Sequence, residues 1–429
     1  MKVFKFGGAS VKSAEAVRHV VDIIKSFYND DIMIVLSAMD KMTNMLEKIT
    51  DSYFYGKYDV LELYNSFVEY HFNIINELFE SVDDKVFIEF NLLKDALYKK
   101  LKKNPSPNYD FEYDQIVPYG ELFSTMIMHN YLNKAGIKCQ LYDARNLIKT
   151  DNKYREAKVD WDLTTGAIRL YVLPYFLDKS DNRSKIAITQ GFIGGAAYGY
   201  NTTLGREGSD YTAAIIAFAL KASEVIIWKD VPGILNADPR FFNDTKKVDK
   251  LSYEDAIELT YYGASVIHPD TIKPLQNDKI PLYVKSFVSP DAEGTEISER
   301  KTTDKLEPFY IIKPDQILIS ISPKDFSYIA EKNLIDIFSI LDKFKIRVNA
   351  MQISAIGLSI CINNNLMRVG PLIKILQENY KVKYNEQLNL ITIRHYNNEA
   401  IKKIKDNKTP LLEQISRLTY QVILKNDLI

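Results

Sequence analysis

The residues best suited to chemistry lie in a glycine-spaced turn that carries Arg206 and Asp210. An alternating apolar run from Ile186 predicts a buried strand before the turn, and an apolar helix is predicted to begin at Ser209. The free N–H groups at a helix N-terminus favour an anion, and the guanidinium of Arg206 can pair with a carboxylate or a phosphate. The segment therefore predicts a binding site for a small anionic molecule.

A second basic residue, Lys5, follows a short apolar strand and precedes the double glycine Gly7-Gly8. Its ammonium group and the N–H groups of the turn suit a phosphoryl group. The three spaced glycines of a dinucleotide-binding turn are absent, and so is a Walker-type Gly-Lys-Ser/Thr. The pattern favours phosphoryl transfer, which depends mainly on positioned charges.

Several further polar residues suit the same reaction. Glu121, at the start of a predicted helix, can pair with a substrate ammonium group. Thr43 and Ser37 can donate hydrogen bonds to an acceptor oxygen. Asp210 or Asp230 can orient the lysine, or water around Mg²⁺.

Some of these residues can instead have ordinary structural roles. Glu121 and Ser209 can be helix caps, Thr43 can be a turn residue, and Arg240 can belong to a surface ion pair. Because each role is common when taken singly, the functional prediction depends on the residues occurring together.

The elements that must position these residues alternate between strand and helix, which predicts an α/β fold. Lys5 and Ser37 follow neighbouring strands, and the carboxyl ends of parallel strands are where open α/β sheets bind ligands. A helical insertion is expected over residues 42–103. The predicted strands cover residues 3–6, 32–36, 137–142, 186–188, 225–228 and 282–284.

A polar, charged stretch over residues 291–307 predicts a boundary between a first domain, residues 1–298, and a second region, residues 299–429. Short β-type and helical runs alternate in the second region, which fits two weak copies of a small α+β unit. Among them we expect separate strands at 382–384 and 390–394 and a helix at 411–418.

Composition narrows the class of protein. The chain has 429 residues and a net charge of -1, from 55 basic and 56 acidic residues, so neither nucleic acid nor a membrane is expected as a partner. Only Cys139 and Cys361 are present, and the histidines are scattered, so no metal site is expected in the protein itself. With no secretory signal apparent at Met1, the expected location is the cytoplasm.

Six segments, in this order and at this spacing, resemble the aspartate kinase family. The family has an amino-acid-kinase αβα sandwich with a largely parallel sheet, followed by a regulatory region of two α+β ACT domains. The resemblance covers about residues 2 to 295. Its segments are Lys5–Ser10, Ser37–Asn44, Tyr119–Glu121, Gln190–Phe192, Thr203–Tyr211, and Trp228–Ile234 with Asp238–Arg240.

This resemblance implies transfer of the γ-phosphoryl group of ATP to the β-carboxylate of L-aspartate, giving 4-phospho-L-aspartate on the route to lysine, threonine and methionine. It implies ATP with Mg²⁺, a homodimer, and a possible amino-acid effector of the C-terminal region. Lys5 and Asp210 are the predicted catalytic residues. The implied aspartate contacts are Thr43, Glu121, Arg206, Glu207, Gly208, Ser209 and Asp210, with Ser37 added from its position. The implied nucleotide contacts are Lys5, Phe6, Gly7, Gly8, Lys229, Asp230, Leu235, Arg240, Ser265 and Val266.

The chain departs from the family pattern at a few positions. Ala9 stands where Thr is usual, and Leu235 where an aromatic residue often contacts the nucleotide. Ser265 replaces the lysine of Gly-Ala-Lys, and Lys229 is the hypothetical substitute for its charge. Glu331-Lys-Asn333 lies where many effector loops have glycine, so feedback by lysine or threonine stays open.

Two other functions stay open. One is an amino-acid-kinase enzyme that acts on glutamate, acetylglutamate, carbamate or a nucleoside monophosphate. The other is a non-catalytic amino-acid sensor, for which Ser265 is the main support.

Overall fold

The computed structural model divides into two compact units, each described by itself. The first holds residues 1–234, 247–257 and 266–301, and the second holds residues 235–246, 258–265 and 302–429. Ser265 and Val266, both predicted nucleotide contacts, lie outside the described residues. The described residues are 1–81, 84–178, 180, 183–264, 267–299, 307–325, 327–406 and 408–425.

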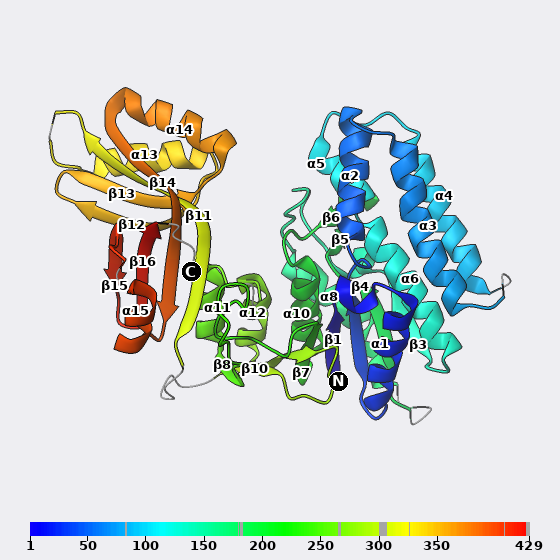
Figure 1. Cartoon of the computed structure of the whole chain (residues 1–429). Coiled ribbons are helices and arrows are strands. Elements are labelled where there is room, and N and C mark those ends of the chain that lie inside the picture. The colour runs from blue at the N-terminus through cyan, green and yellow to red at the C-terminus, as the bar shows by residue number, and fades with distance from the viewer. Residues whose placement is uncertain are drawn as a thin grey trace. The chain divides into compact units, whose positions relative to one another are not determined.

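An eight-stranded sheet forms the centre of the first unit (Figure 1), in the order β3-β4-β2-β1-β7-β9-β10-β8. The strands from β3 to β9 are all parallel to their neighbours, whereas β10 runs antiparallel to β9 and parallel to β8. The predicted parallel sheet is confirmed. Its strands are β1 (Lys2–Phe6), β2 (Ile32–Leu36), β3 (Cys139–Tyr142), β4 (Ile186–Gln190), β7 (Glu224–Lys229), β8 (Lys250–Ser252), β9 (Leu282–Ser286) and β10 (Thr295–Ser298).

Helices cover both faces of this sheet because side chains of its strands alternate in direction. Phe4 and Phe6 of β1 share a core with residues of α1 and α6, whereas Lys5 reaches α10 on the opposite face. The expected αβα sandwich is confirmed. The helices of the first unit are α1 (Ala14–Ser26), α6 (Tyr119–Lys134), α7 (Ala144–Leu147), α8 (Trp161–Tyr171), α9 (Leu173–Leu177), α10 (Gly208–Leu220) and α12 (Pro269–Asn277). Helix α11 (Tyr253–Tyr262) is divided between the two units after residue 257.

The expected helical insertion is present as three long helices, α2 (Met42–Tyr55), α3 (Val60–Leu78) and α4 (Lys85–Leu101), which stand beside one another in Figure 1. A short helix, α5 (Tyr109–Ile116), follows and contacts α2. Its opposite side contacts β6 (Asn201–Thr203), which pairs with β5 (Ile193–Gly195) in a small hairpin. Helix α5 therefore connects the helical insertion to the segment that leads into the Arg206 turn.

The second unit contains a six-stranded antiparallel sheet in the order β12-β13-β11-β14-β16-β15. Two 15-residue strands, β11 (Phe309–Pro323) and β14 (Tyr380–Arg394), pair along their whole length. Helices α13 and α14 pack on one half of the sheet and α15 on the other half. The remaining elements are α13 (Glu331–Lys343), β12 (Val348–Ser354), β13 (Gly357–Asn363), α14 (Leu366–Asn379), α15 (Asn398–Lys405), β15 (Leu412–Ile415) and β16 (Thr419–Lys425).

Two sequence predictions for this unit are wrong. The strands expected at 382–384 and 390–394 are parts of the single strand β14. The helix expected at 411–418 is instead strand β15, which pairs with β16. Its leucines and isoleucine have helical spacing, but Ile415 is 62% exposed while Leu412 is buried, so strand pairing decides the structure.

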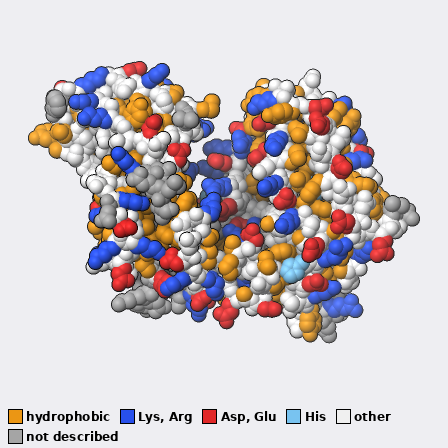
Figure 2. All heavy atoms as spheres, viewed as in Figure 1, with side chains coloured by type: hydrophobic (Ala, Val, Ile, Leu, Met, Phe, Trp, Pro, Cys, Tyr) orange, Lys and Arg blue, Asp and Glu red, His pale blue; other side chains and the backbone are white. Residues whose placement is uncertain are grey.

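Basic and acidic side chains are interspersed over the face shown in Figure 2, in agreement with the net charge of -1. Within the described part of the chain, no helix combines the length and the apolar character needed to cross a membrane.

Candidate active site

Lys5 and Asp210 form a buried ion pair at the centre of the first unit. The Lys5 Nζ atom lies 2.6 Å from Asp210 Oδ1, and the two side chains are 11% and 4% exposed. Burial opposes the charge of Asp210, but the charges of Lys5 and Lys229 outweigh it and hold the pKa of this carboxyl below its usual value. The two predicted catalytic residues, 205 positions apart in sequence, are therefore in contact.

The turn after β1 lies directly against the turn after β2. The Asp40 N–H donates to the Gly8 carbonyl oxygen at 3.0 Å. A Cβ atom at Gly8 would lie 2.7 Å from the carbonyl oxygens of Ala38 and Asp40, so only glycine fits there. A Cβ at Gly7 would lie 3.6 Å from Lys5 Nζ. This places the Gly7-Gly8 backbone beside the lysine ammonium, as the phosphate-site prediction requires.

Glu121 is a buried carboxyl group in the first turn of α6, with 2% exposure. The Ala38 N–H donates to its Oε1 atom at 3.2 Å, and no hydrogen-bond partner of Oε2 occurs among the residues that the structure describes. Burial raises the pKa of Glu121 to about 8, although the Ala38 hydrogen bond and the charge of Lys5 act in the opposite direction. A carboxyl group with an unused buried oxygen suits a cationic ligand and is not a helix cap.

The Arg206 turn leads directly into α10. Gly205 and Glu207 both have positive φ angles, +78° and +55°, and the Gly208 N–H donates to the Gly205 carbonyl oxygen at 3.1 Å. Helix α10 begins at Gly208, so its N-cap is Glu207 and not Ser209. The Arg206 side chain is exposed and makes no ion pair or hydrogen bond within the described ranges.

Ser209 packs closely against the turn that follows β4. A Cβ atom at Gly191 would lie only 2.6 Å from Ser209 Cβ, so this turn needs glycine to approach α10. Ser37 is held from the other side, because the Ser124 hydroxyl of α6 donates to its carbonyl oxygen at 2.7 Å. The turns after β2 and β4 are thus fixed around the helix that carries Asp210.

The remaining predicted residues of the first unit lie at strand and helix ends. Thr43 is half-buried in the first turn of α2, and Lys229 is the half-buried last residue of β7. Asp230 follows it and is exposed. The Phe6 ring is buried and stacked on Trp228, with centroids 5.9 Å apart, so only the backbone of Phe6 is free to contact a ligand.

Leu235 and Arg240 belong to the second compact unit, so the proposed nucleotide contact of each stays a prediction. Arg240 Nη2 lies 2.6 Å from Asp238 Oδ2, and its side chain is 78% exposed. This geometry agrees with the alternative that Arg240 belongs to a surface ion pair.

The sequence interpretation did not identify Asp114, a fully buried residue of α5. Its carboxylate accepts hydrogen bonds from Thr203 and from the Arg155 N–H, next to the Arg206 turn. Burial raises the pKa of Asp114 to about 7, while these hydrogen bonds lower it. No local pattern marks this residue, because its partners lie 41 and 89 positions away in sequence.

Comparison with known proteins shows the family to which the chain belongs. Residues 1–286 match the model of the amino acid kinase family. The chain is 30% identical over 365 residues to lysine-sensitive aspartokinase 3 of Escherichia coli, an alignment covering 84% of this chain and 78% of that protein. The chain belongs to the aspartokinases of the amino acid kinase family. It is also 33% identical over 390 residues to aspartokinase 1 of Arabidopsis thaliana, covering 87% of this chain and 65% of that protein.

Solved aspartokinase structures have the same fold. The structure of E. coli aspartokinase III in complex with aspartate and ADP, the R-state, has a TM-score of 0.83 at 26% identity. The T-state structure with lysine and aspartate has a TM-score of 0.82 at 26% identity. Each comparison covers 100% of this chain and 96% of the other chain. The aspartokinase fold therefore extends beyond the family segment to the antiparallel sheet.

Proposed function

We propose that the protein is an aspartate kinase, which transfers the γ-phosphoryl group of ATP to the β-carboxylate of L-aspartate. A β-carboxylate oxygen attacks the γ-phosphorus, the bond to the bridging β–γ oxygen breaks, and ADP leaves with 4-phospho-L-aspartate as the product. The observation that carries the proposal is the buried Lys5–Asp210 pair beside the Arg206 turn, in a chain of this family. The E. coli relative has been solved with aspartate, the phosphoryl acceptor of this reaction, and with ADP, its nucleotide product.

On the phosphate side, Lys5 and the N–H groups of Gly7 and Gly8 are proposed to bind the transferred group. Asp210 keeps the Lys5 ammonium at a fixed place, so the positive charge needs no reorganisation when negative charge moves onto the leaving oxygen. Lys229 is proposed to add a second cation for the phosphates, because its charge also acts on Asp210. The backbone of Phe6, with Asp230, Leu235, Arg240, Ser265 and Val266, is proposed to complete the nucleotide site.

On the acceptor side, Arg206 is proposed to bind one carboxylate of L-aspartate through two parallel hydrogen bonds. Glu121 would accept the substrate ammonium on its unpaired oxygen. Thr43 and Ser37 would donate to the reacting β-carboxylate. The backbone N–H groups of Glu207, Gly208 and Ser209 at the start of α10 would stabilise the same negative charge.

Mg²⁺ is proposed to enter with ATP. Within the described residues, no group of three or more His, Cys, Asp or Glu side chains is arranged to hold a metal ion. At nucleotide sites Mg²⁺ is commonly bound by phosphate oxygens and water with one or two carboxylates, so the protein needs to supply few ligands. Asp210 and Asp230 are the carboxylates proposed to help. The ion would neutralise phosphate charge, while the protein positions the two reactants.

The wider assignments are also proposals. Residues 1–298 would form the catalytic domain, and residues 299–429 a regulatory region of two ACT-like units that binds an amino-acid effector. We further propose a cytoplasmic homodimer that supplies phosphoaspartate for lysine, threonine and methionine synthesis. The E. coli structure with lysine and aspartate motivates the choice of an amino acid as the effector.

The test is to incubate the purified protein with ATP, Mg²⁺, hydroxylamine and one acid at a time. An acyl phosphate reacts with hydroxylamine to give a coloured hydroxamate, and we expect this product with L-aspartate. Product only with glutamate, N-acetylglutamate or carbamate would contradict the proposed substrate. Absence of product with every acid would contradict catalysis and favour a sensor.

A further inference from the structure

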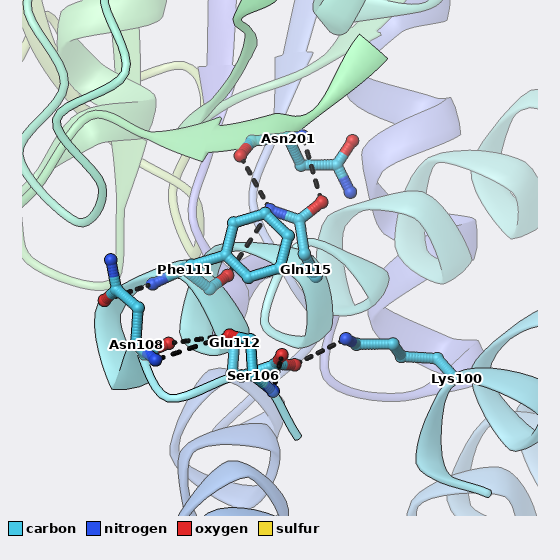
Figure 3. Close-up of polar contacts among 7 residues, drawn as sticks. All are labelled: Lys100, Ser106, Asn108, Phe111, Glu112, Gln115 and Asn201. Atoms are coloured by element: carbon cyan, nitrogen blue, oxygen red, sulfur yellow. Dashed lines mark hydrogen bonds and ion pairs between the residues drawn. The ribbon is translucent and has the colours of Figure 1, made fainter. Parts of the chain in front are cut away.

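Helix α5 is joined by side-chain contacts to elements on both of its sides (Figure 3). On one side, Glu112 forms an ion pair with Lys100 of α4 at 2.5 Å and accepts a hydrogen bond from the Ser106 N–H at 2.7 Å. On the other side, Gln115 Nε2 donates to the Asn201 carbonyl oxygen at 3.0 Å, and the Asn201 N–H donates back to Gln115 Oε1 at 3.1 Å. These contacts fix α5 between the helical insertion and the first residue of β6.

Asp114 lies between Glu112 and Gln115 in α5, and its carboxylate accepts hydrogen bonds from two separate backbone segments. Its Oδ1 atom accepts the Thr203 hydroxyl at 2.7 Å. Its Oδ2 atom accepts the Thr203 N–H and the Arg155 N–H, each at 3.0 Å. Both oxygens are therefore used, and Asp114 is 0% exposed. Removing the carboxylate would leave two backbone donors without their partner.

The two linked segments support the turn that carries Arg206. The Ala157 N–H donates to the Thr203 carbonyl oxygen at 3.0 Å, so the segment around Arg155 runs beside the end of β6. A Cβ atom at Gly205 would lie 3.5 Å from the Arg155 carbonyl oxygen and 3.4 Å from Glu156 Cγ. Since Arg206 follows Gly205 directly, the position of its backbone depends on the contacts that Asp114 makes.

The neighbouring residue Tyr113 extends the connection to α2. Its hydroxyl donates to Glu47 Oε1 at 2.8 Å, and Glu47 lies four residues after Thr43, one turn further along the same helix. Consecutive residues of α5 thus contact the helix that carries Thr43 and the strand that leads to Arg206. These are two of the residues proposed to bind L-aspartate.

We propose that Asp114 is a positioning residue for L-aspartate, which acts by holding the Thr203 backbone so that Arg206 meets a substrate carboxylate. The inference rests on the proposed function. In this proposal α5 positions only the residues that bind L-aspartate, because the contacts of α5 described above do not involve Lys5, Gly7 or Gly8. Loss of the Asp114 carboxylate should therefore weaken aspartate binding and leave ATP binding unchanged.

The test compares Asp114→Ala with Asp114→Asn in steady-state kinetics with each substrate varied. We expect Asp114→Ala to raise KM for L-aspartate by about tenfold or more, since small displacements of a binding group are costly, with KM for ATP unchanged. Asp114→Asn should restore KM to within about threefold, because its amide oxygen can accept both N–H groups and its amide nitrogen can donate to the Thr203 hydroxyl. Equal increases in both KM values, or an Asn variant as impaired as Ala, would overturn the inference.

Asp110→Ala is the matched control on the same helix. Asp110 forms an exposed ion pair with Arg155 Nη1 at 3.3 Å, so its loss should change KM by less than about twofold. If Asp114→Ala does not fold, Thr203→Val is the alternative, because it removes the hydroxyl that donates to Asp114. This variant should raise KM for L-aspartate alone by about threefold, which corresponds to roughly the contribution of one hydrogen bond. No increase in Thr203→Val would overturn the inference.

A second readout separates this inference from the proposed function. In hydrogen–deuterium exchange, Asp114→Ala should speed exchange in peptides that cover residues 203–210, and Asp110→Ala should not. This result would support the positioning role even if the wild-type protein made no aspartyl hydroxamate, an outcome that would contradict only the proposed function. Unchanged exchange over residues 203–210 would overturn the positioning role itself.

Discussion

Lys5 and Arg206 carry the two positive charges of the proposed site, and the fold positions them in different ways. Lys5 projects from a central strand, is nearly buried, and already has its counter-charge in Asp210 at 2.6 Å. Arg206 is exposed on a turn with two positive φ angles beside it and has no side-chain partner among the described residues. The charge on the proposed phosphate side is therefore already paired, whereas the arginine on the proposed acceptor side is unpaired within the described residues.

The two buried carboxyl groups of the proposed site, Asp210 and Glu121, show a similar contrast. Asp210 has a charged partner, whereas one oxygen of Glu121 has no hydrogen-bond partner among the described residues. Two lysine charges outweigh burial at Asp210 and lower its pKa, which favours the charged carboxylate beside Lys5. Burial dominates at Glu121 and raises its pKa to about 8, and one of its oxygens has no hydrogen bond to the described residues. Glu121 therefore suits a cation that arrives with the substrate.

Replacing Lys5 tests the organised side and has the largest expected effect. Lys5→Ala should lower kcat by at least roughly 10²-fold, the scale observed when a preorganised stabilising group is lost. The measurement is the rate of hydroxamate formation at saturating ATP and L-aspartate. Lys221→Ala, which removes a lysine from an exposed ion pair with Asp278, is the control and should leave kcat within about twofold. A Lys5→Ala enzyme with normal kcat would refute the phosphate-side assignment.

Replacing Arg206 by lysine tests the substrate-dependent side and has a smaller expected effect. Arg206→Lys keeps the charge but loses the planar, two-pronged hydrogen bonding of the guanidinium. We expect KM for L-aspartate to rise about 30-fold, within the range for a charged hydrogen bond, while KM for ATP stays constant. An increase confined to KM for ATP would place Arg206 on the phosphate side and contradict the proposed division of roles between Lys5 and Arg206.

The smallest expected effect is the pH dependence of L-aspartate binding through Glu121. The raised pKa means that Glu121 in the free protein is mostly protonated at pH 7, whereas a bound ammonium group favours the carboxylate. Binding at pH 7 should therefore release most of one proton, and affinity should rise by roughly threefold to tenfold from pH 7 to pH 8.

Calorimetry in buffers of different ionisation enthalpy measures this proton release. Glu121→Gln cannot release the proton and should show neither effect. Proton uptake on binding, or identical pH dependence in the two proteins, would contradict the proposed contact between Glu121 and the substrate ammonium.

Much of the proposed phosphate side is predictable from sequence because its residues lie near the ends of strands or in the turns directly after them. The apolar run before Gly7-Gly8 and the run before Ser37 predict neighbouring parallel strands, and the register Lys5–Val35 confirms it. Because these strands are parallel, Lys5 and the turns that follow β1 and β2 must lie at the same end of the sheet, where the strands have their carboxyl ends.

The hydrogen bonds that hold the Arg206 turn through Asp114 were not predictable in the same way. Asp114 lies between Tyr113 and Gln115 in α5 with no local pattern that marks it as buried, yet it is buried because Thr203 and Arg155 lie against it. The helix predicted at 411–418 failed for a related reason, since pairing of β15 with β16 overrides its helical spacing. Hydrogen bonds to another segment decide both cases, far away in sequence for Asp114 and within a hairpin for β15, and the apolar spacing of each segment does not reveal them.

A crystal structure of the protein with L-aspartate and a non-hydrolysable ATP analogue tests the central claim most directly. We predict the γ-phosphate within hydrogen-bond distance of Lys5 Nζ, an aspartate carboxylate on the Arg206 guanidinium, and the aspartate ammonium on Glu121. A nucleotide bound away from Lys5, or an aspartate that contacts neither Arg206 nor Glu121, would contradict the account.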